Sequence, residues 1–146
     1  MPNFALSKTK SNKIKKMENS GKLNGKVALI TGASKGIGAG IAKAYAKEGA
    51  AVVVNYASSR EGADKVVQEI SALGGKAIAI QGNVENAADV KRLFEETIKA
   101  FGKLDILVNN AGIYNFAGIL DITEESFHQM FKIGRASCRQ RVLAGV

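Results

Sequence analysis

The residues best suited to chemistry lie in one glycine-rich stretch, Thr31–Gly38, with the spacing G-x-x-x-G-x-G. It follows the apolar run Val27–Ile30 and precedes apolar residues at helical spacing, which predicts a strand that turns directly into a helix. Backbone N–H groups at such a helix start point outward, and the helix dipole adds partial positive charge, so the turn favours a phosphate. Glycines would let a pyrophosphate approach the backbone closely. Glycine-rich turns also close strands that bind nothing, so the pattern depends on its surroundings.

Short apolar strands and amphipathic helices alternate around this stretch. Gly49, Gly74 and Gly102 follow three of the predicted helices and would end them. Ser58–Glu61 has the S-x-x-E form of a capping box, and Thr123 is typical of the N-cap of a further helix. The predicted strands are 27–31, 51–55, 76–81 and 104–108.

These repeated β–α–β units predict the fold class α/β. We expect a Rossmann-like doubly wound parallel sheet with helices on both faces, truncated after about four strands in the order 3-2-1-4. Ligands of such sheets bind at the carboxyl ends of the strands. Four loops would therefore meet along one rim, namely 32–38, 55–58, 81–84 and 109–113.

The stretch after the second predicted strand bears on which nucleotide would fit. Proteins that bind NAD through such a turn usually carry Asp or Glu there, which hydrogen-bonds the ribose 2′-hydroxyl. The stretch Asn55–Arg60 holds no acid, and the first one is Glu61. A carboxylate would repel a 2′-phosphate, so its absence, with Lys35, Ser58 and Arg60 nearby, favours NADP, with NAD also possible. Ser58 could instead cap a helix, and the two cations could be solvated surface charges.

Two blocks together resemble the short-chain dehydrogenase/reductase family. Thr31–Gly38 is similar to the family's T-G-x-x-x-G-x-G cofactor turn, and Asn109–Gly112 is similar to its N-N-A-G block. The pair Asn83–Val84 fits in order and separation. The resemblance covers residues 24–132, where bacterial glucose 1-dehydrogenases and 3-oxoacyl-carrier-protein reductases are also similar. It implies an oxidoreductase that transfers hydride between NADP(H) and a carbonyl or alcohol substrate of sugar or 3-oxoacyl type.

The resemblance also implies a set of cofactor-binding residues. The glycine turn would hold the pyrophosphate, the loop after the second strand would meet the adenosine ribose, and the loop after the third would flank the adenine. Many members have Asp where this chain has Asn83, so that contact could differ. Asn109 and Asn110 could equally tie the fourth strand to its neighbours. The implied residues are Gly32, Ser34, Lys35, Gly36, Ile37, Gly38, Asn55, Tyr56, Ala57, Ser58, Asn83, Val84, Asn110, Ala111 and Gly112.

The family's catalytic Y-x-x-x-K pair has no counterpart in this sequence. Each of the three tyrosines is followed, four residues on, by glycine or arginine. In the family the Tyr exchanges a proton with the substrate, and the Lys charge lowers the tyrosine pKa. We therefore assign no catalytic residue and expect the chain as given to be inactive. The resemblance also implies an Asn near position 134, where this chain has Gly134.

The sequence divides into three expected segments. Residues 1–24 are polar and lysine-rich and predict a disordered basic leader, with Met1 or Met17 as the true start. Residues 25–132 would form an incomplete NAD(P)-binding domain. Residues 133–146 resemble a translated sequencing adapter, an artefact, with a genuine basic tail as the alternative. A sheet that ends at the fourth strand would leave an exposed edge, so we expect marginal stability or aggregation.

The net charge of +8 lies at the ends of the chain. Five lysines in residues 1–16 and three arginines in residues 133–146 account for it, and the body between them carries 13 basic and 13 acidic residues. A nucleic-acid-binding domain should carry a basic face within its fold, so we expect no nucleic-acid partner. Binding of nucleic acid through the leader is the weakest alternative function. Apolar runs fall short of the ~20 residues that span a membrane, so we expect no membrane partner.

Cys138 and His128 are the single cysteine and histidine. They predict neither an internal disulfide nor a metal site, and favour a cytoplasmic location. The expected partners are a small-molecule carbonyl or alcohol substrate and, if the protein is full-length, further copies in a homo-oligomer such as a tetramer. A non-catalytic dinucleotide-binding module is the main alternative function.

Overall fold

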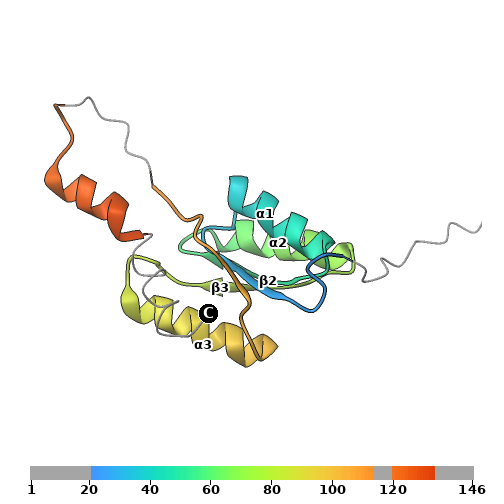
Figure 1. The fold of residues 1–146 in the computed structure, drawn as a ribbon. Coiled ribbons are helices and arrows are strands. Elements are labelled where there is room, and N and C mark those ends of the chain that lie inside the picture. The colour runs from blue at the N-terminus through green and yellow to red at the C-terminus, as the bar shows by residue number, and fades with distance from the viewer. Residues whose placement is uncertain (1–20, 114–119, 134–146) are drawn as a thin grey trace, which may run out of the picture.

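The computed structural model describes residues 21–113 and 120–133. Residues 1–20 of the expected leader and the tail from residue 134 onward, with Gly134 and Cys138, lie outside the described residues. Residues 21–24 of that leader are described and form a bend followed by a turn, and the Leu23 N–H donates to the Glu48 carbonyl over 2.9 Å, so these four residues belong to the fold. Strands and helices alternate along the chain as predicted (Figure 1). The elements are β1 (Val27–Ile30), α1 (Gly36–Lys47), β2 (Ala51–Tyr56), α2 (Arg60–Ala72), β3 (Lys76–Gln81), α3 (Ala87–Phe101) and β4 (Ile106–Val108), followed by a helix over residues 124–133.

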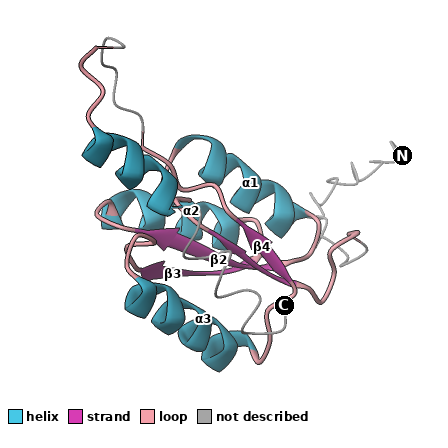
Figure 2. Cartoon of the chain, turned by 60° about the vertical axis from the view of Figure 1, so that its left-hand side comes forward, coloured by secondary structure: helices cyan, strands magenta, loops and turns pink. Residues whose placement is uncertain are grey.

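The four labelled strands form one parallel sheet in the order β3-β2-β1-β4. This confirms the predicted fold class and strand order. Helices α1 and α2 cover one face of the sheet, and α3 covers the other (Figures 1 and 2). Strand β1 is central: its Ala28 is in register with Val52 of β2 on one side and with Ile106 of β4 on the other. The glycine turn therefore leaves the middle of the sheet.

The core forms two layers because successive residues of a strand point to opposite faces. Ala28 and Ile30 of β1 join the cluster under α1 and α2, whereas Val27 and Leu29 join the cluster against α3. All four side chains are buried. Burial on both faces explains why this strand is a continuous apolar run rather than an alternating one.

The capping box predicted at Ser58–Glu61 is wrong. Helix α2 begins at Arg60, Ser59 is its N-cap, and no side chain caps it. The N–H of Arg60 donates to the Ser58 carbonyl over 3.1 Å, so the chain makes one further turn before the helix starts. Ser58 then lies outside the helix, and Glu61 falls one position short of the place that a capping box requires.

Two other helix boundaries confirm the predictions. Gly102 is the left-handed C-cap of α3, with φ +80°, and its N–H donates to the Ile98 carbonyl over 2.7 Å. Thr123 caps helix 124–133, where its Oγ1 accepts the N–H of Ser126 over 3.2 Å. Ile133, which the sequence analysis assigns to the tail, is the last described residue of this helix and is buried in the cluster against α3.

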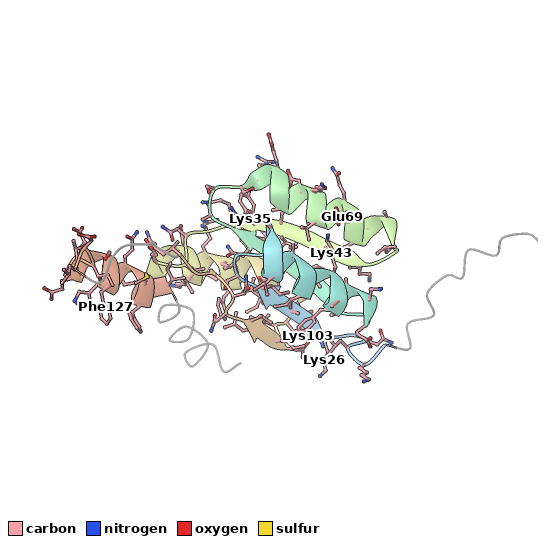
Figure 3. All side chains as sticks on the ribbon, turned by 90° about the horizontal axis from the view of Figure 1, so that it is seen from above. Lys26, Lys35, Lys43, Glu69, Lys103 and Phe127 are labelled. Carbon is pink, nitrogen blue, oxygen red and sulfur yellow. The ribbon has the colours of Figure 1, made fainter. Side chains whose placement is uncertain are left out.

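Strand β4 is shorter than predicted because Asp105 bonds to β1 with its side chain. The N–H of Val27 donates to Asp105 Oδ2 over 2.8 Å, and the N–H of Asp105 donates to the Val27 carbonyl over 3.0 Å. Lys26 and Lys103 place their Nζ atoms 3.8 and 3.1 Å from the same carboxylate, at one end of the sheet (Figure 3). Within the described residues, β4 pairs with β1 alone and is half-buried. The marginal stability expected from this edge stays a prediction.

The described residues hold neither a helix long and apolar enough to cross a membrane nor a cluster of three or more potential metal ligands.

Asp105 makes the stability of the sheet depend on pH. The Val27 N–H first, and then Lys103, hold the pKa of the Asp105 carboxyl below its ordinary value. A lowered native pKa stabilises the fold above the unfolded pKa of about 4, and this gain is lost as pH falls through the native pKa. We expect Asp105→Asn to lower the free energy of unfolding by about 1 kcal/mol at pH 6 and by less as the pH falls below 4.

Urea unfolding of both proteins at several pH values measures this difference. Asp64→Asn is the matched control, because Asp64 pairs with Arg60 on the exposed side of α2. It should change the free energy of unfolding by less than ~0.5 kcal/mol. If Asp105→Asn lowers the free energy of unfolding by the same amount from pH 6 to pH 2, the lowered pKa of Asp105 does not contribute to stability.

Candidate functional site

The glycine turn joins β1 to α1 at the carboxyl ends of the strands. Lys35 is the N-cap of α1, makes no side-chain capping bond, and is followed by no acid in the first turn. The first amides of a helix have no partner within the helix, so this end presents bare N–H groups and the positive end of the dipole. Helix α3 differs, because Asn86 Oδ1 accepts the Ala88 N–H over 2.9 Å and Asp89 lies in its first turn.

Two glycines of the turn are required for different reasons. Gly36 has φ +58°, and a Cβ built on it would meet nothing within 4 Å, so the backbone here is open to a ligand. Gly38 is buried, and a Cβ there would lie 2.5 Å from Asn110 Nδ2 and 2.6 Å from the Gly32 carbonyl oxygen. The turn is therefore open at its first helical residue and closely packed two residues later. Ile37, between them, is 77% exposed.

Thr31 ties the glycine turn to the loop after β4. Its hydroxyl is buried and accepts the N–H groups of Asn110 and Ala111, each over 3.0 Å. The same hydroxyl donates to the Val108 carbonyl over 3.3 Å. Thr31 begins the glycine-rich motif, but the sequence predicts no role for it. A hydroxyl at the end of an otherwise apolar strand was the signal for one.

Asn110 closes the same junction from the opposite side. Its Nδ2 donates to the carbonyls of Thr31 and Gly32, over 3.0 and 3.1 Å. The suggestion that this residue ties strand four to its neighbours agrees with these bonds. Ala111 is half-buried beside it, and Gly112 is exposed at the rim.

Asn55 ties the glycine turn to β3. It is 1% exposed, and its Oδ1 accepts the N–H of Gly32 over 3.2 Å. Its Nδ2 donates to the carbonyls of Ile80 and Gly82, over 3.3 and 3.1 Å. Its side chain is thus fully bonded to protein and lies behind the surface. Beyond it, Tyr56 is half-buried, whereas Ala57 and Ser58 are exposed.

The loop after β3 is the fourth part of the rim. Asn83 is exposed, and its N–H donates to Asp89 Oδ2 over 2.9 Å while its own Oδ1 accepts the Glu85 N–H over 3.0 Å. This N–H, and next the Arg92 guanidinium, hold the pKa of the Asp89 carboxyl below its usual range. Val84 is buried in the cluster against α3, so its side chain lies in the core.

The rim fits an anionic dinucleotide. Lys35, Gly36 and Ile37 are exposed at the bare end of α1, and Ser34 is half-buried beside them. Lys35 lies where α1 begins (Figure 3). Within 55–60 no carboxylate faces this end, and the first acid, Glu61, is in the first turn of α2. Bare amides favour binding of a diphosphate, and a second strand that ends without an acid favours a phosphorylated ribose.

The family model of the short chain dehydrogenases matches residues 26–140, and the chain belongs to this family. An uncharacterized oxidoreductase of Methylorubrum extorquens is 60% identical over 112 residues, which are 77% of this chain and 45% of that protein. Versicolorin reductase 1 of Aspergillus parasiticus is 50% identical over 117 residues, 80% of this chain and 45% of its own length.

A solved structure gives the same result. The short chain dehydrogenase of Burkholderia cenocepacia, in complex with NADP, is 42% identical with a TM-score of 0.72, and the match covers 80% of this chain and 51% of that one. The chain therefore spans about half the length of the relatives that it matches.

Removal of the Thr31 hydroxyl should destabilise the junction. Thr31→Val keeps the shape of the side chain but leaves two part-buried N–H groups without their acceptor, so we expect a loss of ~1–2 kcal/mol in the free energy of unfolding. Thr31→Ser, which keeps the hydroxyl, should lose less. Urea unfolding measures both, and a Val variant as stable as the parent would show that the hydroxyl bonds contribute nothing.

A methyl group should be tolerated very differently at two glycines of α1. Gly38→Ala forces contacts with backbone and with the Asn110 amide, so we expect a loss of ~1–3 kcal/mol. Gly40→Ala, the matched control, places its methyl in open space and should gain ~0.5–1 kcal/mol from helix propensity. Thermal unfolding separates the two, and equal effects would contradict the close packing at residue 38.

Proposed function

We propose that the chain binds NADP(H) along this rim and forms the cofactor-binding half of an oxidoreductase that acts on a carbonyl or alcohol substrate. The observation that carries the proposal is the start of α1, where bare amides, the dipole and the open face of Gly36 coincide. The NADP complex of the Burkholderia cenocepacia relative supports the choice of nucleotide. When bound, the nicotinamide supplies or takes up the hydride.

The exposed residues of the rim would contact the cofactor directly. Within the glycine turn, the amides of the exposed residues Lys35–Ile37 would bind the diphosphate, and Ala57 with Ser58 would meet the adenosine ribose. Asn83 would flank the adenine, and Gly112 would lie on the nicotinamide side. The exposure of these residues and the position of their loops at the rim support these contacts.

Four other members of the predicted set would act through the loops. Asn55 and Asn110 hold the glycine turn with their side-chain amides, and Ala111 gives its N–H to Thr31. Val84 packs in the core beneath its loop. These residues would fix where the exposed residues lie rather than touch the nucleotide with their side chains.

The substrate and the assembly are finer proposals. The candidate substrates are sugars and 3-oxoacyl compounds, and the relative named versicolorin reductase 1 adds versicolorin to them. A homo-oligomer is supported by the exposed side chains of Phe127 and Phe131 on helix 124–133. A cytoplasmic location is supported by a cysteine count too low for an internal disulfide. The chain alone, without a Y-x-x-x-K pair, should bind cofactor but not turn over.

Calorimetric titration of the chain with NADPH and NADH tests the function. Lys35→Gln removes a cation at the rim, so we expect NADPH affinity to fall about fivefold and NADH affinity to change less than twofold. Lys47→Gln is the matched control, because it removes the same charge from the opposite end of α1. A folded parent that binds neither nucleotide, or equal effects of the two variants, would refute the proposal.

A further inference from the structure

Arg92 connects α3 to the end of β3. Its Nη2 lies 3.0 Å from the Gln81 carbonyl oxygen and 3.3 Å from Gln81 Oε1. The same Nη2 lies 3.3 Å from Asp89 Oδ1, and Nη1 donates to Glu96 Oε1 over 3.0 Å. The guanidinium therefore joins the first turns of α3 to Gln81, the last residue of β3. An ion pair within one helix would bond only to residues three or four positions away.

The same contact decides which way the Gln81 amide points. A guanidinium only donates hydrogen bonds, so the Gln81 oxygen must face Arg92 and the Gln81 nitrogen must face away from it. That nitrogen, Nε2, donates to the Ala57 carbonyl over 3.1 Å. Arg92 thus fixes the direction of a hydrogen-bonded bridge from β3 to the loop that follows β2.

Asp89 extends this network to the adenine side of the rim. One carboxylate oxygen faces Arg92, and the other accepts the N–H of Asn83 over 2.9 Å. One guanidinium therefore acts on two of the four loops at the rim. The other two, the glycine turn and the loop after β4, are held separately by Thr31 and Asn110.

We propose that Gln81, oriented by Arg92, is a positioning residue that selects NADP(H) over NAD(H) by holding the Ala57–Ser58 loop in place for the phosphorylated ribose. This inference rests on the proposed function. Ser58 is exposed and lies outside α2, where its carbonyl accepts the N–H of Arg60. The Gln81 bridge adds a second constraint on this loop, at the carbonyl of Ala57. Loss of the bridge would leave the diphosphate turn intact, since Asn55 and Asn110 fix that turn without Gln81.

Gln81→Met tests the bridge, because methionine keeps the length of the side chain and its neutrality but removes both the donor and the acceptor. We expect NADPH affinity to fall about fivefold and NADH affinity less than twofold, measured by calorimetry on one preparation. Arg92→Lys keeps the charge but loses the planar fork, so it should lower the same affinity ratio by a smaller factor. Lys91→Met is the control, because Lys91 pairs with Glu95 on the exposed side of α3. This substitution should change neither affinity.

The ratio of the two affinities is the deciding quantity, because a partly unfolded preparation lowers the binding stoichiometry for both nucleotides and leaves the ratio unchanged. An unchanged ratio in Gln81→Met, with NADPH still bound by the parent, would overturn this inference and leave the proposed function standing. An equal loss for both nucleotides would give Gln81 a general structural role and would also overturn it. A folded parent that binds neither nucleotide would overturn both proposals.

Discussion

The arrangement of the site depends on buried and part-buried hydrogen bonds that tie the carboxyl ends of adjacent strands together. Thr31 and Asn110 join β1 to the loop after β4, and Asn55 joins the glycine turn to the end of β3. A buried polar group left without a partner costs ~1–3 kcal/mol, so each tie allows few alternative positions of its loop. The side-chain polar atoms that are fully buried in the described residues all have partners.

These ties have a functional consequence because they use side chains and leave the first amides of α1 free. The side chain of Asn86 accepts a hydrogen bond from an amide at the start of α3, whereas Lys35, the N-cap of α1, makes no such bond. A rigid support with bare donors at its surface is the condition for binding an anion without reorganisation. Lys26 and Lys103, the basic side chains near Asp105, lie at the amino ends of β1 and β4, away from this rim (Figure 3).

Much of the fold could be predicted because it follows from local patterns. Strand β3 was predicted at its observed bounds, and the stops at Gly74 and Gly102 hold because glycine adopts positive φ readily. The capping box at Ser58 failed because a local motif does not show where a turn closes. The roles of Thr31 and Gln81 were missed because their partners are distant in sequence, 77 to 80 residues away for Thr31 and 24 for the Ala57 carbonyl that Gln81 bonds. Contacts of that range arise only once the strand order is fixed.

We propose that the bare amides at the start of α1 bind the diphosphate of the nucleotide, and the other contacts of the rim depend on this one. Amide chemical shifts of the isotopically labelled chain, followed through a titration with NADPH, test it most directly. We expect the largest shift changes at residues 32–38, with a second set at Ala57 and Ser58. Changes concentrated at the opposite edge of the sheet, or an unchanged spectrum of a folded chain, would contradict it.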